Sequence, residues 1–412
     1  MNDLFIDRSI SEVEENIRFQ IKSIKNSHDY NPKVDPRSKF NLDTTKLAFH
    51  RERVEAWQRG EHVAPITIDM ALTQRCSYAC TFCYAGLQQN PSAPVDLATY
   101  EQFLDDCVQI GHKEGEGVKA ISLVSDGEST ESPHFVPFIV KAKENGIDIA
   151  SGTNGYRIRK SDLPILVDNL TYLRFNFDAA DPEAYSEIMG ANKKKYERVV
   201  SNIKDCVKLK KERNSNITIG LQMVLMPEYA DQVIPLALLG KELGVDYTVI
   251  KHCSDDEDGR LGVDYSWYVS ELATELLETA EAVSNDSYSV QAKWSKIRTG
   301  RDRKYSKCFG TPLMLQMSGT GIVAPCGSFF HQRYQNNHIG DIKEERFYDI
   351  WSSRKYKRIM SYLASKSFNA KTQCASLCLQ DKVNEKLNDL MENGIELDNV
   401  SGLPLPEHVN FI

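Results

Sequence analysis

The sequence contains no run of about 18 apolar residues, the length that a membrane-spanning helix needs. It also begins without a basic stretch followed by an apolar one, so Met1–Phe5 does not predict a secretory signal. Basic residues are not in excess, since 50 lysines and arginines face 58 aspartates and glutamates, for a net charge of −8. That balance argues against a general nucleic-acid binder. These absences predict a cytoplasmic protein with no membrane or nucleic-acid partner.

What the sequence does contain is enough apolar residues for a large core. Its 412 residues, 41% of them hydrophobic, predict two or three structural units. Near the start, apolar residues recur every three or four positions, which is typical of a helix, at Ile10, Val13, Ile17, Ile21 and Ile24. A second helical pattern covers residues 44–59. We therefore predict an N-terminal helical extension over residues 1–64, with packing as its expected role.

From residue 65 the sequence alternates between strand-like and helix-like segments. The strand-like runs are 66–72, 118–124, 147–150, 172–177, 217–225 and 247–250. Six such units in series predict an α/β fold with parallel strands and outer helices, two units short of an eightfold barrel. We therefore predict a partial (β/α)6 TIM-type barrel over residues 65–292, ending in a further helix over 262–292. Residues 293–412 are predicted to form a small cysteine-rich α+β domain.

Three of the ten cysteines, Cys76, Cys80 and Cys83, follow the first predicted strand with the spacing C-x3-C-x2-C. The active sites of such barrels lie at the carboxyl ends of the strands, where this loop is expected. A [4Fe–4S] cluster normally takes four thiolates, so three ligands on one loop would leave one iron open. Zinc is the alternative, although a structural zinc site usually needs four ligands and no histidine follows nearby. Three clustered cysteines also pair poorly as disulfides.

The loop resembles the signature of the radical S-adenosylmethionine (SAM) family, including Phe82, the aromatic residue before the last cysteine. The resemblance implies that the open iron binds the amino and carboxylate groups of SAM. Reductive cleavage would then give a 5′-deoxyadenosyl radical, which abstracts hydrogen from unactivated carbon, and the aromatic residue would pack near the adenine. An incomplete barrel is also implied. The competing hypothesis is a non-catalytic protein that binds an iron–sulfur cluster or zinc.

The segment after the second strand, Asp126, Gly127 and Glu128, resembles the glycine-rich motif of the same family. A glycine lets the backbone pass close to a ligand, and a carboxylate can accept from the methionine amino group. This copy departs from the family pattern at Asp126 and at Ser129. The alternative is an ordinary turn after a strand. We predict that the three residues contact SAM.

Polar residues also follow the third strand and interrupt the fourth and fifth. Asn154 lies in a Thr-Asn-Gly segment that resembles one of the family, although an ordinary turn is equally consistent. Arg174 and Asn176 share one face of the fourth strand, and Gln222 interrupts the fifth, where a parallel barrel should be apolar. The resemblance implies ribose contacts for Asn176 and a carboxylate contact for Arg174. Gln222 is a further candidate for binding SAM.

The sixth strand leads into a polar string, residues 250–258, at the predicted barrel mouth. Cys253 lies within it. A thiol there could donate a hydrogen atom to a substrate radical, because S–H bonds are weaker than most C–H bonds. Cys253 is therefore a candidate catalytic residue. The alternative is that it fills a small gap in the core.

Four further cysteines lie near the C-terminus, at Cys308, Cys326, Cys374 and Cys378. The first two flank a predicted hairpin formed by 313–317 and 321–324. The set resembles the C-terminal modules called SPASM and twitch, and four cysteines match the shorter twitch form with one auxiliary [4Fe–4S] cluster. Zinc is again possible, because four thiolates also make a structural zinc site. The predicted cofactors are SAM and two [4Fe–4S] clusters.

A fully ligated auxiliary cluster can accept an electron, which favours net oxidation of a substrate radical. We therefore predict a radical SAM oxidoreductase of the dehydrogenase type. Peptide-modifying relatives often carry a strand-rich domain before the barrel, and the helical pattern of residues 1–64 favours a small polar substrate such as a sugar, nucleotide sugar or amino-sugar. The alternatives are a redox-neutral epimerase that uses Cys253 and a peptide-modifying maturase.

Reduction of the cluster requires an electron donor of low potential, such as a flavodoxin or ferredoxin. Both kinds of donor are acidic. The sequence has a strongly basic stretch over residues 293–307 that, together with Arg354, Lys355, Lys357 and Arg358, could dock the donor, although a solvated charged surface is the favoured interpretation.

Overall fold

The computed structural model describes residues 8–38, 40–87, 93–376 and 378–412, so the expectation for Met1–Phe5 lies outside the described residues. The described strands form one curved sheet in the order β10-β9-β8-β1-β2-β3-β4-β5-β6-β7. Strands β1 to β8 run parallel to one another, and β9 runs antiparallel to both of its neighbours, β8 and β10. The strands are β1 Thr67–Met70, β2 Ala120–Leu123, β3 Asp148–Thr153, β4 Tyr172–Asn176, β5 Thr218–Leu225, β6 Tyr247–His252, β7 Ser289–Ala292, β8 Met314–Met317, β9 Ile322–Ala324 and β10 Gly340–Asp341.

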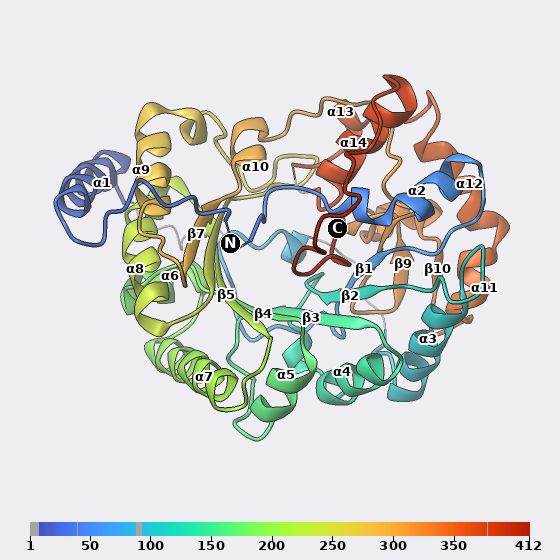
Figure 1. Ribbon diagram of the computed structural model, residues 1–412, viewed down its shortest axis with the longest axis horizontal. Coiled ribbons are helices and arrows are strands. Elements are labelled where there is room, and N and C mark those ends of the chain that lie inside the picture. The colour runs from blue at the N-terminus through green and yellow to red at the C-terminus, as the bar shows by residue number, and fades with distance from the viewer. Residues whose placement is uncertain (1–7, 39, 88–92, 377) are drawn as a thin grey trace.

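Helices cover the outer face of the sheet, and the C-terminal segment lies on its inner side (Figure 1). Helix α6 begins as its sequence predicts, since Asp181 caps Ala184 and Pro182 occupies the first position. The helices are α1 Ile10–Lys25, α2 Arg51–Gln58, α3 Leu97–Gln109, α4 Phe135–Glu144, α5 Leu163–Asn169, α6 Pro182–Met189, α7 Lys193–Glu212, α8 Val233–Leu243, α9 Glu271–Glu281, α10 Trp294–Thr299, α11 Phe347–Ser352, α12 Arg354–Leu363, α13 Ala370–Gln373 and α14 Asp381–Glu392. Across the described part of the chain, no helix is both long and apolar enough to span a membrane.

The six predicted strands are present as β1 to β6, and the predicted partial barrel is confirmed. The structure adds two parallel strands. Strand β7 follows β6 where the sequence predicted only helix, and the side chain of Gln291 in it donates to the carbonyl oxygen of Phe40, 2.6 Å away. Strand β8 pairs with β1, so the predicted hairpin joins the main sheet. Because β7 and β8 do not pair within the described residues, the barrel stays open.

The N-terminal extension is helical, as predicted, and its apolar stripe is buried. Val13, Ile17, Ile21 and Ile24 of α1 are each at most 7% exposed, and α1 packs on α9. Beyond α1 the chain runs through Asn41–Lys46 into the barrel interior, where it meets the C-terminal segment. Lys46 donates to the carbonyl oxygen of Phe411 at 3.1 Å. The segment Asn41–Lys46 and the C-terminal segment thus close the floor of the barrel.

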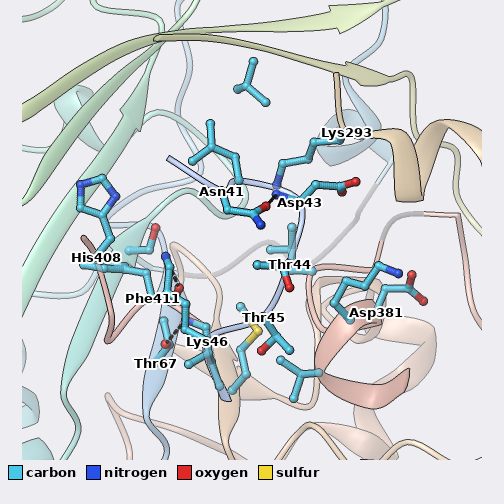
Figure 2. Close-up of a pocket in the computed structure, with 18 of the residues that line it drawn as sticks. Asn41, Asp43, Thr44, Thr45, Lys46, Thr67, Lys293, Asp381, His408 and Phe411 are labelled. Carbon is cyan, nitrogen blue, oxygen red and sulfur yellow. Dashed lines mark hydrogen bonds between the residues drawn. The ribbon is translucent and has the colours of Figure 1, made fainter. Parts of the chain in front are cut away.

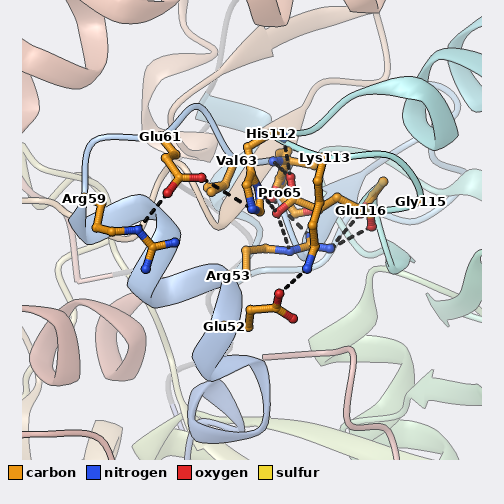
Figure 3. A network of polar contacts seen from close by, with 12 residues as sticks. Glu52, Arg53, Arg59, Glu61, Val63, Pro65, His112, Lys113, Gly115 and Glu116 are labelled. Carbon is orange, nitrogen blue, oxygen red and sulfur yellow. Dashed lines mark hydrogen bonds and ion pairs between the residues drawn. The ribbon is translucent and has the colours of Figure 1, made fainter.

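A buried ion pair joins α2 to the loop between α3 and β2 (Figure 3). The Arg53 guanidinium donates to four carbonyl oxygens, those of Ala64, Pro65, Glu116 and Gly117, at 2.8 to 3.1 Å. The Glu116 carboxylate accepts from the backbone N–H groups of Ala64 and His112, both at 2.9 Å. Arg53 is 7% exposed and Glu116 4%. The pair therefore fixes the segment that leads into β1.

Replacing Glu116 with alanine is expected to lower the free energy of unfolding by roughly 3–5 kcal/mol, because it leaves a buried cation without its partner. Denaturant unfolding measures the loss. The matched control is Glu52→Ala, since Glu52 belongs to the same network but pairs with Lys113 at the surface. The control should leave the unfolding midpoint unchanged. Equal stability of the two variants would contradict the bracing role of Glu116.

Candidate active site

The three-cysteine loop lies where predicted, directly after the carboxyl end of β1. Cys76 and Cys83 are exposed, and Cys80 is partly buried with its Sγ 3.7 Å from the carbonyl oxygen of Met189. Burial, and then the neighbouring Glu128 and Cys83, raise the pKa of Cys76 to about 11. Thiolates so close together need a bound cation to be stable. The three side chains therefore fit the open [4Fe–4S] cluster predicted from the sequence.

The backbone just before the loop is held between two glycines from distant parts of the chain. Gly127, after β2, has φ +112°, and a Cβ there would lie 2.1 Å from the carbonyl oxygen of Thr73. Gly319, in the β8–β9 turn, approaches from the other side, and its Cβ would lie 2.3 Å from the carbonyl carbon of Thr73. The close approach that Gly127 permits is thus to the Thr73–Gln74 hinge. This packing fixes where the cysteine loop leaves β1.

Asp126 also holds the Thr73–Gln74 segment in place. Its carboxylate accepts from Gln74 Nε2 at 2.8 Å, from Ser318 Oγ at 2.7 Å and from the backbone N–H of Gly319 at 2.9 Å. Burial raises its pKa despite these donors. The contact of Asp126 with SAM stays a prediction, and its three protein partners favour a bracing role.

Glu128 braces the next pair of strand ends. Its carboxylate accepts from Thr153 Oγ1 and from the backbone N–H of Asn154, both at 2.7 Å, and from the N–H and Oγ1 of Thr130 at 3.1 and 2.7 Å. A carboxylate has about four acceptor positions. Little capacity is left for the amino group of SAM, so the contact predicted for Glu128 stays a prediction that these bonds disfavour.

The other predicted cofactor residues lie along the carboxyl edge of the sheet. Asn154 reaches the cysteine loop, with Nδ2 3.7 Å from the Sγ of Cys76. Asn176 and Gln222 lie opposite each other in the β4–β5 register, and Gln222 donates to Asn176 at 2.9 Å. Phe82 is half-buried against the core. The structure brings these residues to one region, and their contacts with SAM stay predictions.

Cys253 lies in the core after β6. It is 3% exposed, its Sγ lies 3.8 Å from the carbonyl oxygen of Ser254, and burial raises its pKa to about 12. It does not line the barrel pocket described next. This position fits the gap-filling alternative, and the hydrogen-donor role stays a prediction.

A pocket of about 190 Å³ occupies the lower barrel interior (Figure 2). Its walls include Asp69 of β1 and Arg174 of β4, and its floor is formed by Asn41–Lys46 and the C-terminal segment. Figure 2 shows Lys293 beside Asn41 and Asp43, across from His408 and Phe411. Sequence reasoning missed Lys293 as a barrel residue, because it begins a basic run that is typical of a surface.

The basic run is divided between the interior and the surface, so the docking surface predicted over residues 293–307 is wrong for its interior members. Lys293 and Lys296 line the pocket, and Arg303 is 7% exposed and donates to the carbonyl oxygens of Ala375 and Ser376 at 2.7 and 3.0 Å. The exposed basic residues of the run are Arg298, Arg301 and Lys304. Only these remain available to a donor protein.

The four C-terminal cysteines line one cavity, although they come from segments up to 70 residues apart in sequence. They are Cys308, Cys326, Cys374 and Cys378. Asn384 Nδ2 lies 3.5 Å from the Sγ of Cys308. In the described part of the chain, no three Cys, His, Asp or Glu side chains converge on a point that would hold a single metal ion. Four thiols lining one cavity fit the auxiliary cluster predicted from the sequence.

Cys378 lines both cavities, that of the C-terminal cysteines and that of the barrel. Of the seven cysteines in the two sets, Cys378 alone lines the barrel pocket, and the three-cysteine loop follows the carboxyl end of β1 outside that lining. Burial raises the pKa of Tyr84, one residue after Cys83, and the neighbouring Cys83 and Cys326 add to the rise. The auxiliary cavity therefore meets the barrel pocket at Cys378.

Comparison with known proteins agrees with this arrangement. The family model for the radical SAM superfamily matches residues 70–237, and that for an iron–sulfur cluster-binding domain, SPASM, matches residues 308–379. Curated relatives include a probable GTP 3′,8-cyclase of Thermococcus kodakarensis, 26% identical over 38% of this chain and 48% of the relative. Another is an S-adenosylmethionine-dependent nucleotide dehydratase of Psychrobacter lutiphocae, 26% identical over 28% and 41%. The chain spans less than half the length of these relatives.

Solved structures share the fold over most of the chain. SuiB of Streptococcus suis bound to S-adenosylmethionine has a TM-score of 0.57 at 16% identity, covering 87% of this chain and 82% of that one. The protein anSMEcpe with bound AdoMet has a TM-score of 0.51 at 14% identity, covering 73% and 84%. The two matching family models confirm SAM and iron–sulfur clusters as the predicted cofactors. The chain belongs to the radical SAM superfamily and carries a SPASM-type cluster-binding domain after its barrel.

Proposed function

We propose that the protein oxidises a small polar substrate held in the barrel interior. Cys76, Cys80 and Cys83 would hold the cluster that, with SAM, supplies a 5′-deoxyadenosyl radical for removing a hydrogen atom from carbon. The four C-terminal cysteines would hold a second cluster, which supplies a one-electron acceptor. Loss of a hydrogen atom, and then of one electron and one proton, oxidises the substrate by two electrons. The low-potential donor provides the electron that SAM cleavage consumes.

The observation that carries this proposal is the position of Cys378, which lines the substrate pocket and the auxiliary cavity together. An electron acceptor that borders the pocket favours oxidation over the redox-neutral epimerisation weighed from the sequence. The buried position of Cys253 also disfavours that alternative.

The size of the pocket supports a small molecule over a peptide. Its volume of about 190 Å³ is enclosed below by two segments of the chain itself. The relatives named a GTP 3′,8-cyclase and a nucleotide dehydratase act, by their names, on small molecules. SuiB has been solved with a precursor peptide, and at 15% identity that likeness concerns the fold alone.

The test is anaerobic reconstitution with iron and sulfide, reduction by dithionite, and measurement of 5′-deoxyadenosine. We expect SAM-dependent formation of 5′-deoxyadenosine and, with a deuterated substrate, transfer of deuterium into it. A protein that holds zinc at the three-cysteine loop, or that never cleaves SAM, would rule the proposal out. A substrate that exchanges hydrogen without net oxidation would favour epimerisation.

A further inference from the structure

Basic side chains gather in the barrel interior. Arg174 on β4 and Lys293, directly after β7, line the pocket, and Lys251, at the carboxyl end of β6, lies near both of them without lining it. Ile250 pairs with Ala292, so the two lysines follow side by side on neighbouring strands. Within the residues of known placement, none of the three forms a hydrogen bond or ion pair, and the buried Nε of Arg174 has no partner. Three basic side chains thus lie close together, and none of them is held in an ion pair.

Nearby carboxylates offset part of this charge, since Asp43 favours the charged form of Lys293 and Asp178 favours that of Lys251. Lys296 adds a fourth cation, and its Nζ donates to the carbonyl oxygen of Cys378 at 3.1 Å. The carboxyl group of Asp69 faces the cations, but burial raises its pKa to about 7, so it is only partly ionised near neutral pH. Asp43 is engaged by the backbone N–H and the hydroxyl of Ser295.

Such an arrangement is costly without a ligand. An isolated charge taken out of water is unfavourable unless it is paired, and like charges side by side add repulsion. Burial lowers the pKa of both Lys251 and Lys293 to about 7, and repulsion from Arg174 and Lys296 adds to the shift. Polar clusters of this kind gather at functional sites.

We infer that Arg174, Lys251 and Lys293 bind a phosphate group of the substrate in the barrel interior. The inference rests on the proposed function and names its substrate class, a small phosphorylated molecule. Two unpartnered lysines beside a guanidinium suit a dianion, since Arg and Lys both bind phosphate strongly. The volume of about 190 Å³ is below the roughly 300–1,000 Å³ of drug-sized pockets, so the molecule is small.

The geometry also orients the substrate. Asn41–Lys46 and the C-terminal segment close the pocket below, so an anion held there points the rest of the molecule towards the strand ends. The three-cysteine loop lies at those ends, after β1. Phosphate binding would thus place the reacting carbon between the two cysteine sites.

The experiment is calorimetric titration of the reconstituted, unreduced protein with inorganic phosphate and with sulfate. Binding is measured without reduction, so its failure is distinct from a failure to cleave SAM. We expect saturable binding of both dianions, weakened about ten-fold or more by Lys293→Gln and by Lys251→Gln, because each removes a charge-assisted hydrogen bond. The matched control, Lys304→Gln, changes an exposed lysine of the same basic run and should bind as the parent does.

The variants are expected to fold. Each removes an uncompensated buried cation, so the anion-free Lys293→Gln protein should melt at the same temperature as the parent or higher. A marked loss of stability would show that the lysine has a structural partner, and would overturn the inference. So would the absence of saturable binding, or equal affinity of Lys293→Gln, Lys251→Gln and the parent. If Arg174→Gln changed the affinity for SAM and left the affinity for phosphate intact, Arg174 would be assigned to SAM and not to the phosphate group.

The pH dependence gives an independent check. Sulfate stays a dianion between pH 6 and 8, whereas both lysines are protonated below their pKa of about 7 and lose the proton above it. Sulfate should therefore bind more tightly at pH 6 than at pH 8. The charged groups that face the two lysines are Lys46, Arg174, Lys296, Asp43, Asp69 and Asp178. Asp69, whose pKa is about 7, loses its proton over the same range and changes anion binding in the same direction. Affinity that is equal at the two pH values, or higher at pH 8, would count against the lysines as the binding groups.

Discussion

Replacing Cys83 with serine is expected to abolish the formation of 5′-deoxyadenosine, with a loss of at least about a thousand-fold. The loop offers three thiols, and two cannot hold a cluster that already lacks its fourth protein ligand. Iron content should fall from about eight to about four atoms per chain, because the C-terminal cysteines are untouched. Both quantities are measured on the same anaerobic preparation.

The matched control is Cys206→Ser, in a buried cysteine of α7 that lies outside both cysteine sets. It tests whether loss of any cysteine disturbs the protein, and it should keep both clusters and the cleavage activity. If Cys83→Ser retained its full iron content and activity, the loop would not be the site of SAM cleavage.

Replacing Gly127 with alanine is expected to destabilise the protein by at least about 2 kcal/mol and to reduce loading of the first cluster. The new Cβ would lie 2.1 Å from the carbonyl oxygen of Thr73, and the atoms it meets are backbone, which cannot swing away. The hinge must then shift, and the cysteine loop with it. Denaturant unfolding and iron analysis measure the two effects.

The control for this variant is Gly146→Ala, between α4 and β3. Gly146 also has a positive φ, +73°, but a Cβ there would meet nothing within 4 Å. Both substitutions carry the strain of a left-handed backbone, so their difference isolates the steric overlap. Equal losses in the two variants would mean that the contact of Gly127 with Thr73 does not position the loop.

The sequence predicted the parts of this protein whose signals are local. Six strands could be predicted because each is a short apolar run between helices. The first cysteine site could be predicted from its close C-x3-C-x2-C spacing, and the second from its resemblance to a known cysteine-rich module. Strand β7 was missed because Ser289 and Gln291 are polar, and their partners lie in the segment before α2. A local sequence pattern cannot predict a strand whose side-chain hydrogen bonds join it to residues some 250 positions earlier in the chain.

The roles of individual site residues depended on tertiary contacts that sequence does not show. Asp126 and Gly127 carry a motif that implies a cofactor contact, yet their nearest partners are Gln74, Ser318 and Gly319. The interior position of Lys293 could not be predicted from the sequence for a related reason. Charge in sequence is typical of a surface, and only closure of the barrel turns Lys293 inward.

Strand β8 gives the molecule a dependence between its two halves. Because it lies between β1 and β9, the C-terminal half supplies the neighbour that covers one edge of the first strand. A protein cut between barrel and auxiliary segment would expose that edge to intermolecular pairing. It would also lose Gly319, one of the two glycines that pack against the backbone of Thr73 and Gln74, just before the first cysteine loop. We therefore expect that a change which unfolds the C-terminal cysteine domain also displaces the first cysteine loop, because both depend on β8 and on the turn that contains Gly319.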